Sequence, residues 1–210
     1  MAWMLRACLS RPVTLPYSRA PEFQEGTTAG LAAAMVATGA VAREAACWRS
    51  KVLHIYRHGE PVNLALVDLA IASDSVIGAR AIWEVNRLSE LFLTRAHPWS
   101  IGLSAIGGML HPLDAHSPSG LHLVFGDGGQ TVQAPIGPGL FATLHVRHVR
   151  TLTPGQRTPL HLERQVALAF DGERDMTAGP GDDLEVMLST EGPWVIDPRR
   201  AIEAGVRSRL

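Results

Sequence analysis

The sequence predicts a β-rich α+β fold in which the larger part of the chain forms an antiparallel β-sandwich. From Lys51 onward, short apolar runs are bounded by Gly, Pro, Asp or Asn, as in strands joined by tight turns. In the runs 165–170 and 183–189 the larger apolar residues occupy alternate positions, which indicates strands with one buried face. Ahead of Lys51, an Ala-rich segment has the spacing of a helix.

These patterns divide the chain into four parts. We expect a divergent or disordered start over 1–21 and a helical segment over 22–50. The β-rich domain is expected over 51–197 and an amphipathic helix over 198–210.

Both helical parts have recognisable ends. Thr27 and Thr28 are suitable N-caps for the first helix, and Gly39 is a typical residue just past a last turn. Pro198 suits the first turn of the closing helix. The residues of that helix expected to face inward are Ala201, Ile202 and Val206.

Eight runs of the β-rich domain have the pattern of strands, and a short helix is expected around 83–91. Two glycine turns, Gly126-Asp127-Gly128-Gly129 and Asp171-Gly172, offer the positive-φ residues of hairpin tips. The first of them is not a phosphate loop by this interpretation, because a strand rather than a helix follows it. The eight runs are 51–57, 62–72, 100–106, 120–125, 130–136, 140–149, 165–170 and 183–189.

Composition excludes several classes of protein. Nineteen basic and twenty acidic residues leave a net charge of -1, without the electrostatic footprint of a nucleic-acid or membrane-surface protein. No run reaches the roughly 18 apolar residues of a spanning helix, so we expect a soluble protein. Two cysteines without paired spacing favour a reducing compartment, and we expect the protein in the cytoplasm. Cys8 and Cys47 lack the spacing of metal ligands, and we expect no metal site. No Gly-x-Ser-x-Gly nucleophile motif occurs.

Asp68 is an anomaly in an apolar run. A period of two along 62–72 places it on the face of Leu64, Leu66 and Ala70, inside an almost continuous strand. A buried carboxylate must be paired or hydrogen-bonded. Two interpretations stay open: a strand-end Asp satisfied by a loop amide or an Arg, or a ligand contact.

Asp171 and Glu173 flank Gly172 at a predicted hairpin tip. On an extended backbone their carboxylates would point to one side and repel, which raises one pKa and favours a proton acceptor or a metal-facing pair. An Asp-Gly-Glu turn is also common in hairpins without a function. Both interpretations stay open.

Several motifs together resemble a known family. The run WSIGLSAIGGMLHP over 99–112, the API that follows at 134–136, VALAFDGER over 166–174 and the closing helix resemble the C-terminal part of the ATP-NAD kinase family. Within that family, the segments NLALVDLAI, VIGARAIW and LSAIGGMLHP are most similar in sequence to the acetoin catabolism protein X branch. The likeness runs from about Glu22 to the C-terminus.

The resemblance implies the C-terminal β-sandwich domain of the NAD kinase and diacylglycerol kinase-like fold, with remnant helices of an N-terminal α/β domain. It implies ATP-dependent phosphoryl transfer to NAD or another small hydroxyl acceptor. In the family the α/β half carries a Gly-Gly-Asp-Gly loop for ATP phosphates. We expect the chain to begin after that loop, and so to be inactive alone. The alternative is a non-catalytic nucleotide-binding or oligomerisation module.

The resemblance also assigns site residues. Val67-Asp68 falls where NAD kinases have an Asn-Glu that contacts the dinucleotide, so Asp68 is expected to bind cofactor. Residues 96–101 fall where they have Thr-Gly-Ser-Thr-Ala-Tyr, although almost nothing of that motif survives. The further cofactor-binding residues expected here are Ser100, Gly102 and Ser104.

Asp171 and Glu173 are the expected catalytic residues. Asp171-Gly172-Glu173 is similar to the Asp-Gly-Gln of NAD kinases and the Asp-Gly-Glu of related lipid kinases, whose Glu is proposed as a base near the acceptor hydroxyl. The resemblance implies ATP with Mg as cofactors and a small-molecule nucleotide as partner. It also implies a homo-oligomer, or a second chain that supplies the missing N-terminal half.

Overall fold

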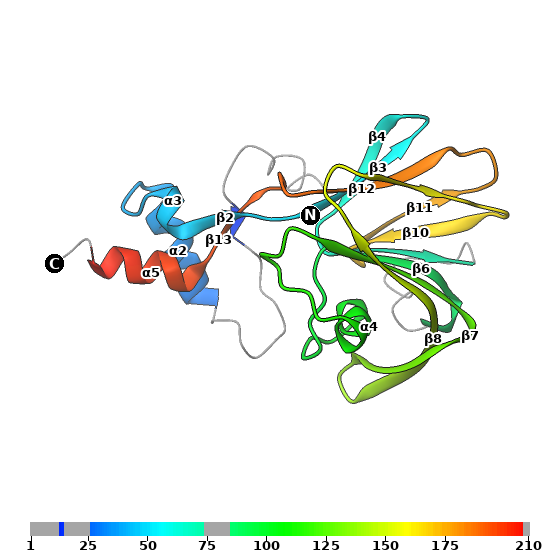
Figure 1. Cartoon of the computed structure of the whole chain (residues 1–210). Helices are drawn as coiled ribbons and strands as arrows, with labels where there is room; N and C mark the ends of the chain where they lie inside the picture. The colour runs from blue at the N-terminus through cyan, green and yellow to red at the C-terminus, as the bar shows by residue number, and fades with distance from the viewer. Residues whose placement is uncertain (1–12, 15–25, 74–84, 208–210) are drawn as a thin grey trace. The chain divides into compact units, whose positions relative to one another are not determined.

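The computed structural model describes residues 13–14, 26–73 and 85–207, which form two compact units (Figure 1). The first unit draws on residues 1–50 and 191–210, and the second on 51–190. The expected start over 1–21 lies almost wholly outside the described residues. None of the helices in the described ranges is long and apolar enough to cross a membrane.

The first unit packs helices beside a small sheet with the strand order β1-β13-β2. Gly39 has φ +77° and ends the first helix, as predicted. Thr27 and Thr28 lie within that helix, so neither is its N-cap. Val206 was expected to face inward but is 57% exposed. The elements are β1 (Val13–Thr14), α2 (Gly26–Ala37), α3 (Arg43–Ala46), β2 (Cys47–Arg49), β13 (Trp194–Ile196) and α5 (Pro198–Arg207).

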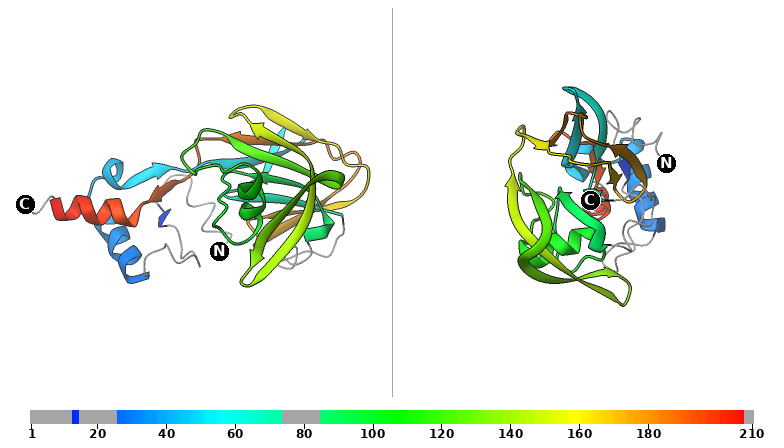
Figure 2. Two further views of the ribbon diagram at one scale, coloured as in Figure 1. Left: turned by 60° about the horizontal axis from the view of Figure 1, so that its bottom comes forward. Right: turned by 90° about the vertical axis from the view of Figure 1, so that its right-hand side faces the viewer.

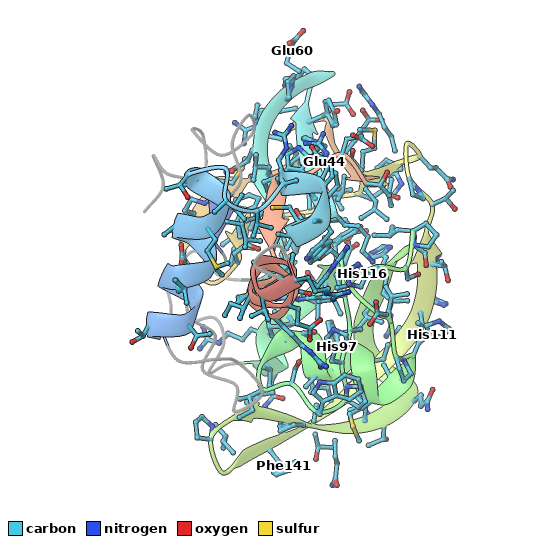
Figure 3. All side chains as sticks on the ribbon, turned by 90° about the vertical axis from the view of Figure 1, so that its left-hand side faces the viewer. Glu44, Glu60, His97, His111, His116 and Phe141 are labelled. Carbon is cyan, nitrogen blue, oxygen red and sulfur yellow. The ribbon has the colours of Figure 1, made fainter. Side chains whose placement is uncertain are left out.

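The second unit contains two antiparallel sheets. A six-stranded sheet has the order β11-β10-β5-β6-β7-β8, and a four-stranded sheet has the order β4-β3-β12-β9. Figure 3 places Glu60 at the tip of the β3–β4 hairpin and Phe141 at the tip of β7–β8. The strands are β3 (Val52–Arg57), β4 (Glu60–Ala65), β5 (Asp68–Ala72), β6 (Leu88–Leu93), β7 (Gly120–Gly137), β8 (Leu140–Leu152), β9 (Arg157–Leu160), β10 (Val166–Phe170), β11 (Arg174–Ala178) and β12 (Leu184–Ser189).

One hydrophobic core lies between the two sheets. Ile55 and Val186 of the four-stranded sheet share it with Ile71, Phe92 and Phe170 of the six-stranded sheet. Sheets that interdigitate their inner faces in this way form a sandwich. The prediction of a β-rich fold built on packed antiparallel sheets is confirmed.

A second core covers the other face of the six-stranded sheet. The helix α4 (Leu103–Leu110) lies against the concave side of the curved β7–β8 ribbon (Figure 2). A strand was expected over 100–106, but residues 103–106 belong to the helix α4, so this expectation is wrong there. A short apolar run does not distinguish a strand from a buried helix. Ala169 packs into this second core, so β10 is buried on both faces rather than one.

The predicted single strand over 62–72 is two strands. β4 ends at Ala65 and belongs to the four-stranded sheet, whereas β5 begins at Asp68 in the six-stranded sheet. The chain crosses between sheets at Leu66 and Val67. Period-two alternation cannot reveal this crossing, because both strands are apolar and only two residues separate them.

Two further expectations fail in the second unit. Gly126-Asp127-Gly128-Gly129 is not a hairpin tip but a bulge inside β7, where Phe125 and Gln130 both pair with Val146. The short helix expected around 83–91 is a 3-10 turn, η1 (Val85–Arg87), followed by β6. Residues 83 and 84 lie outside the described residues.

Candidate functional site

Three segments meet at one end of the six-stranded sheet. Asp68 opens β5 and pairs with Leu93, the last residue of β6, so Arg95 follows two residues beyond this pair. The turn after β10 brings Asp171 to the same end, because the backbone N–H of Asp171 donates to the carbonyl oxygen of Asp68 at 3.0 Å. The structure thus brings Asp68 and Asp171 together, although 103 residues separate them.

The carboxylate of Asp171 accepts hydrogen bonds from three consecutive backbone N–H groups. Its Oδ1 lies 2.9 Å from the nitrogen of Leu66, 2.7 Å from that of Val67 and 3.3 Å from that of Asp68. These amides belong to the crossing between the sheets, and consecutive amides of this kind form a concave anion site. Asp171 therefore fixes the crossing segment from which β5 begins.

The Asp171 turn has the backbone predicted for it. Asp171 and Gly172 have φ +53° and +66°, and the N–H of Glu173 donates to the Phe170 carbonyl at 3.0 Å. Positive φ at both central residues is the mark of a type I′ hairpin turn. Asp-Gly is one of the few dipeptides that adopt it readily.

Asp68 has an unusual environment for a carboxylate. Burial and the nearby charge of Asp171 raise the pKa of Asp68 to about 7, and Arg95 opposes the rise. The residue as a whole is partly buried. Among the residues that the structure describes, no donor lies within hydrogen-bonding distance of this carboxylate. It is thus a proton acceptor that the fold leaves unengaged.

Arg95 is a site residue that sequence reasoning missed. Burial lowers the pKa of its guanidinium, and the carboxylates of Asp68 and Asp171 partly offset this effect. Its backbone is held by Ser104, whose Oγ donates to the Arg95 carbonyl at 3.1 Å. The only available sign was an arginine just past an apolar strand, a position that is common in loops.

The expected pair of repelling carboxylates exists, but with a different partner. Asp171 is directed onto the crossing amides, and Glu173 is exposed. The carboxylate coupled to Asp171 is that of Asp68. Arg174 supports the arrangement: it donates to the Leu64 carbonyl at 2.6 Å and lies 3.7 Å from the Asp171 carboxylate.

The expected cofactor-binding residues around α4 serve mainly to shape the loop before this helix. Ser104 is 9% exposed, and its hydroxyl also accepts the N–H of His97 at 3.4 Å. Gly102 has φ +107°, and its N–H donates to the Pro135 carbonyl at 2.9 Å. The N–H of Ser100 donates to the His97 carbonyl. These bonds hold the segment that carries Arg95.

Lys51 is the only lysine of the chain and lies near this cluster. Its Nζ donates to the carbonyl oxygens of Asp114 at 3.1 Å and Ser119 at 2.7 Å. Burial lowers the pKa of Lys51 to about 8; the charge of Asp114 opposes this decrease, and the charge of Arg95 adds a smaller one. Its contacts indicate that it holds the loop after α4 in place.

The site does not form a metal cage. Among the described residues, no three His, Cys, Asp or Glu side chains gather as metal ligands. Asp68 and Asp171 are only two carboxylates, and the second is occupied by backbone amides. The residues present therefore do not fit a protein-held magnesium ion.

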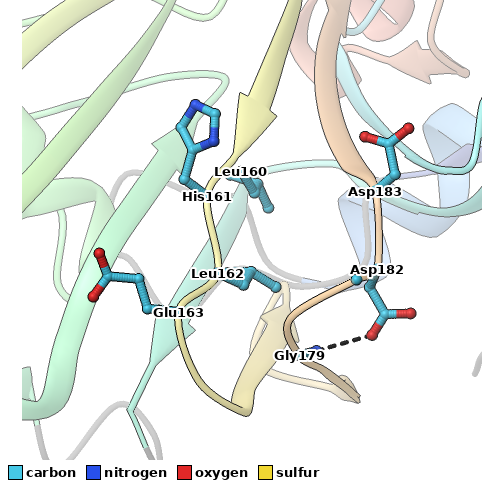
Figure 4. Close-up of a pocket in the computed structure, with 8 residues that line it drawn as sticks. Leu160, His161, Leu162, Glu163, Gly179, Asp182 and Asp183 are labelled. Carbon is cyan, nitrogen blue, oxygen red and sulfur yellow. Dashed lines mark hydrogen bonds between the residues drawn. The ribbon is translucent and has the colours of Figure 1, made fainter.

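A separate hollow of about 310 Å³ lies between β9 and the start of β12 (Figure 4). Its polar side chains do not converge: His161 and Glu163 point in different directions, and Asp182 accepts the N–H of Gly179 at 2.8 Å. Asp182 also pairs with Arg57 at 3.3 Å. The hollow offers no group of side chains for chemistry, and the cluster around Asp68 is the stronger site.

Comparison with known proteins places the chain in a family. Residues 51–191 match the family model of the acetoin catabolism protein X C-terminal domain. The chain is also 35% identical over 197 residues to acetoin catabolism protein X of Cupriavidus necator, an alignment that covers 90% of this chain and 55% of the relative. The chain thus spans about half the length of the relative. This chain therefore belongs to the acetoin catabolism protein X family.

Proposed function

We propose that this domain is the acceptor half of a kinase-like site of the ATP-NAD kinase type, for phosphoryl transfer to NAD or another small hydroxyl acceptor. Asp68 accepts the proton of the acceptor hydroxyl, and Arg95 binds the negative charge of the phosphoryl group. The observation that carries the proposal is the unengaged Asp68 carboxylate, whose pKa is raised to about 7, coupled to Arg95.

The chemistry suits these two side chains. A general base works best when its pKa lies near the working pH, and burial brings Asp68 into that range. Arginine binds phosphoryl oxygens through its planar set of donors. Phosphoryl transfer depends mainly on positioning the reactants and neutralising charge. Asp68 as a base and Arg95 as a cation, both at one end of the sheet, would meet these needs on the side of the acceptor.

Asp171 has a positioning role in this proposal. Its carboxylate accepts hydrogen bonds from the backbone N–H groups of residues 66–68. In this proposal it therefore orients Asp68 and does not take the proton itself. Glu173 is exposed and makes no contact with the cluster that would favour it over Asp68 as the base. This assignment moves the base from the turn to the start of β5.

ATP would be the phosphoryl donor in such a reaction, and the residues described here provide no site for the magnesium ion that would accompany it. The 210 residues contain no Gly-Gly-Asp-Gly sequence, and the described side chains do not form a magnesium cage. The proposal therefore assigns ATP binding to a further segment or chain that carries such a loop. This domain binds and deprotonates the acceptor.

Calorimetric titration of the full chain with NAD tests the acceptor half. We expect binding that Arg95→Gln weakens at least about tenfold, as for a lost charged hydrogen bond. Asp68→Asn should abolish the pH dependence of binding between pH 5.5 and 8. The control is Asp175→Asn, an exposed carboxylate on β11. Equal binding by all variants would contradict the assignment of the site.

A second experiment tests catalysis in the longer relative from Cupriavidus necator. ATP consumption is measured with NAD, glycerol and acetoin as hydroxyl acceptors. Replacing the residue aligned with Asp68 should then lower turnover by about 100-fold or more, as for a lost general base. Unchanged turnover would assign the base to another residue.

A further inference from the structure

The crossing between the two sheets is held from two sides just before Asp68. Its N–H groups donate to the carboxylate of Asp171, and its carbonyl oxygens accept from Thr94. The Oγ1 of Thr94 donates to the Leu66 carbonyl at 2.8 Å and lies 3.3 Å from the Val67 carbonyl oxygen. The backbone N–H of Thr94 also donates to the Val67 carbonyl, at 2.9 Å.

Two successive peptide groups, Leu66-Val67 and Val67-Asp68, are thereby fixed at both ends. In the first, the carbonyl oxygen accepts the Thr94 hydroxyl and the N–H donates to Oδ1 of Asp171 at 2.7 Å. In the second, the carbonyl oxygen accepts the Thr94 N–H and the N–H donates to the same Oδ1 at 3.3 Å. A planar peptide group held in this way cannot rotate without breaking both bonds. Thr94 and Asp171 together therefore set the direction in which the Asp68 side chain leaves the backbone.

Thr94 also belongs to the segment that carries the second member of the proposed acceptor site. It is 2% exposed and directly precedes Arg95. On the other side of Arg95, the N–H of Ala96 donates to the Leu113 carbonyl at 2.9 Å. The backbone of Arg95 is thus anchored before and after the residue. The charges of Asp68 and Arg95 interact across this junction.

We propose that Thr94 is a positioning residue, whose hydroxyl sets the direction and separation of the Asp68 and Arg95 side chains. The inference rests on the proposed function in taking these two side chains as the acceptor site. The alternative is a purely structural role, in which the hydroxyl only satisfies the buried carbonyl of Leu66. Loss of the hydroxyl would then change stability alone, whereas loss of positioning also changes the ionisation of Asp68 and the binding of the acceptor.

Three substitutions of Thr94 and one control separate these roles. Thr94→Val keeps the branched shape and removes the donor, whereas Thr94→Ser keeps the hydroxyl. Thr94→Cys is a milder variant that folds if the valine does not, because a thiol is a weak donor of similar size. Ser89→Ala is the matched control: Ser89 lies on the same strand, β6, and its Oγ donates to the Ile71 carbonyl of β5 at 3.1 Å.

The first measurement is an NMR titration of the Asp68 carboxyl group. In the parent chain, burial and the charge of Asp171 raise the pKa of Asp68 to about 7. In Thr94→Val the crossing is free to shift, so water reaches the carboxylate and the pKa should fall toward its ordinary 3.8. We expect a fall of about 1 or more, a tenfold change in proton affinity, and a smaller fall in Thr94→Cys. Thr94→Ser and Ser89→Ala should keep the parent value.

The second measurement is calorimetric titration with NAD. Thr94→Val should weaken binding at least about tenfold, and Thr94→Ser should restore it. The loss should not add to that of Arg95→Gln, because a residue that acts through another has no further effect once that other is removed. A purely structural effect would instead add to it.

An unchanged Asp68 titration in both Thr94→Val and Thr94→Cys would overturn the inference, even if urea denaturation shows a loss of stability. An equal change in Ser89→Ala, a loss that Thr94→Ser does not restore, or additive losses with Arg95→Gln would also overturn it. Failure of the proposed function is distinguishable. If the parent chain does not bind NAD, the proposed function is wrong, and the Asp68 titration still decides whether Thr94 positions this carboxylate.

Discussion

Asp68 and Asp171 are joined by two hydrogen bonds, in each of which the backbone N–H of one residue donates to an oxygen of the other. The N–H of Asp171 donates to the Asp68 carbonyl at 3.0 Å, and the N–H of Asp68 donates to the Asp171 carboxylate at 3.3 Å. The two carboxylates therefore have different roles although they are neighbours. One is bound to the backbone, and its charge helps to raise the pKa of the other.

Asp171→Ala should destabilise the second unit by about 1 to 3 kcal/mol. The change leaves the amides of residues 66–68 without their acceptor, and buried N–H groups without a partner carry a penalty of this size. It also puts alanine at φ +53°, a conformation that L residues other than Asn and Asp adopt rarely. Urea denaturation measures the free energy of unfolding.

Glu173→Gln is the matched control in the same turn. Glu173 is exposed, and its N–H rather than its carboxylate closes the turn. We expect the free energy of unfolding to change by no more than about 0.5 kcal/mol. A loss as large as that of Asp171→Ala would show that the Glu173 carboxylate has a structural contact.

The pH dependence of stability should report Asp68. An acid with a pKa of about 7 in the folded state, against 3.8 ordinarily, holds its proton more tightly when folded. Its stabilising contribution is therefore complete below pH 3.8 and is lost as pH rises through about 7.

Asp68→Asn removes this dependence, because Asn resembles the protonated acid. The variant should gain stability relative to the parent chain, and the gain should be larger at pH 8 than at pH 4.5. Urea midpoints at the two pH values measure the difference. Asp175→Asn, on the exposed face of β11, should show no such change. A constant difference would show that Asp68 has an ordinary pKa.

The 210-residue chain alone should show no ATP-dependent formation of NADP. It contains no Gly-Gly-Asp-Gly loop to position ATP phosphates, and positioning is most of phosphoryl-transfer catalysis. The assay uses the chain in excess over NAD. Turnover of about 1 per second or more, within the usual range of enzymes, would contradict this expectation.

We also predict that the chain self-associates. Leu31 and Val206 of the first unit are 54% and 57% exposed, and Trp99 and Ile101 of the second are 66% and 57% exposed. Exposed apolar patches are generally interfaces, and two-fold dimers are the commonest solution. Light scattering at micromolar concentration measures the mass. A clean 22.6 kDa monomer would contradict the prediction.

Local patterns predicted much of the sandwich. The alternation of Leu184, Val186 and Leu188 corresponds to buried positions of β12, and Asp171-Gly172 forms the predicted turn. Both depend on a few neighbouring residues, which the sequence displays directly. The Gly126–Gly129 bulge was misassigned because its cause is not local: only the partner Val146, on β8, shows that both sides belong to one strand.

The site was predictable only in part. Asp68 was identified because a carboxylate in an apolar run is unusual, and Asp171 because of its resemblance to a kinase motif. That Asp171 binds the amides of residues 66–68 depends on an approach between segments over 100 residues apart. Arg95 has no local signature, because its importance arises from burial beside those two acids.

The close approach of α4 to the segment that carries Arg95 gives a last prediction. A Cβ at Gly108 would overlap the backbone of His97 and Pro98, which cannot yield as a flexible side chain would. Gly108→Ala should therefore destabilise the second unit by about 1 to 3 kcal/mol, as overpacking does. It should also weaken NAD binding if the proposed role of Arg95 is right, because His97 and Pro98 follow Arg95 directly.

Gly30→Ala is the matched control for this glycine. Gly30 also lies in a helix, but it is exposed and nothing lies within 4 Å of an added Cβ. Alanine there should stabilise the chain by about 0.5 to 1 kcal/mol, the usual difference between the two residues inside a helix. Opposite signs for the two substitutions in urea denaturation, with NAD binding altered only in Gly108→Ala, are the expected result. Equal stabilisation would mean that α4 does not press on the Arg95 segment, and the positioning of Arg95 would need another cause.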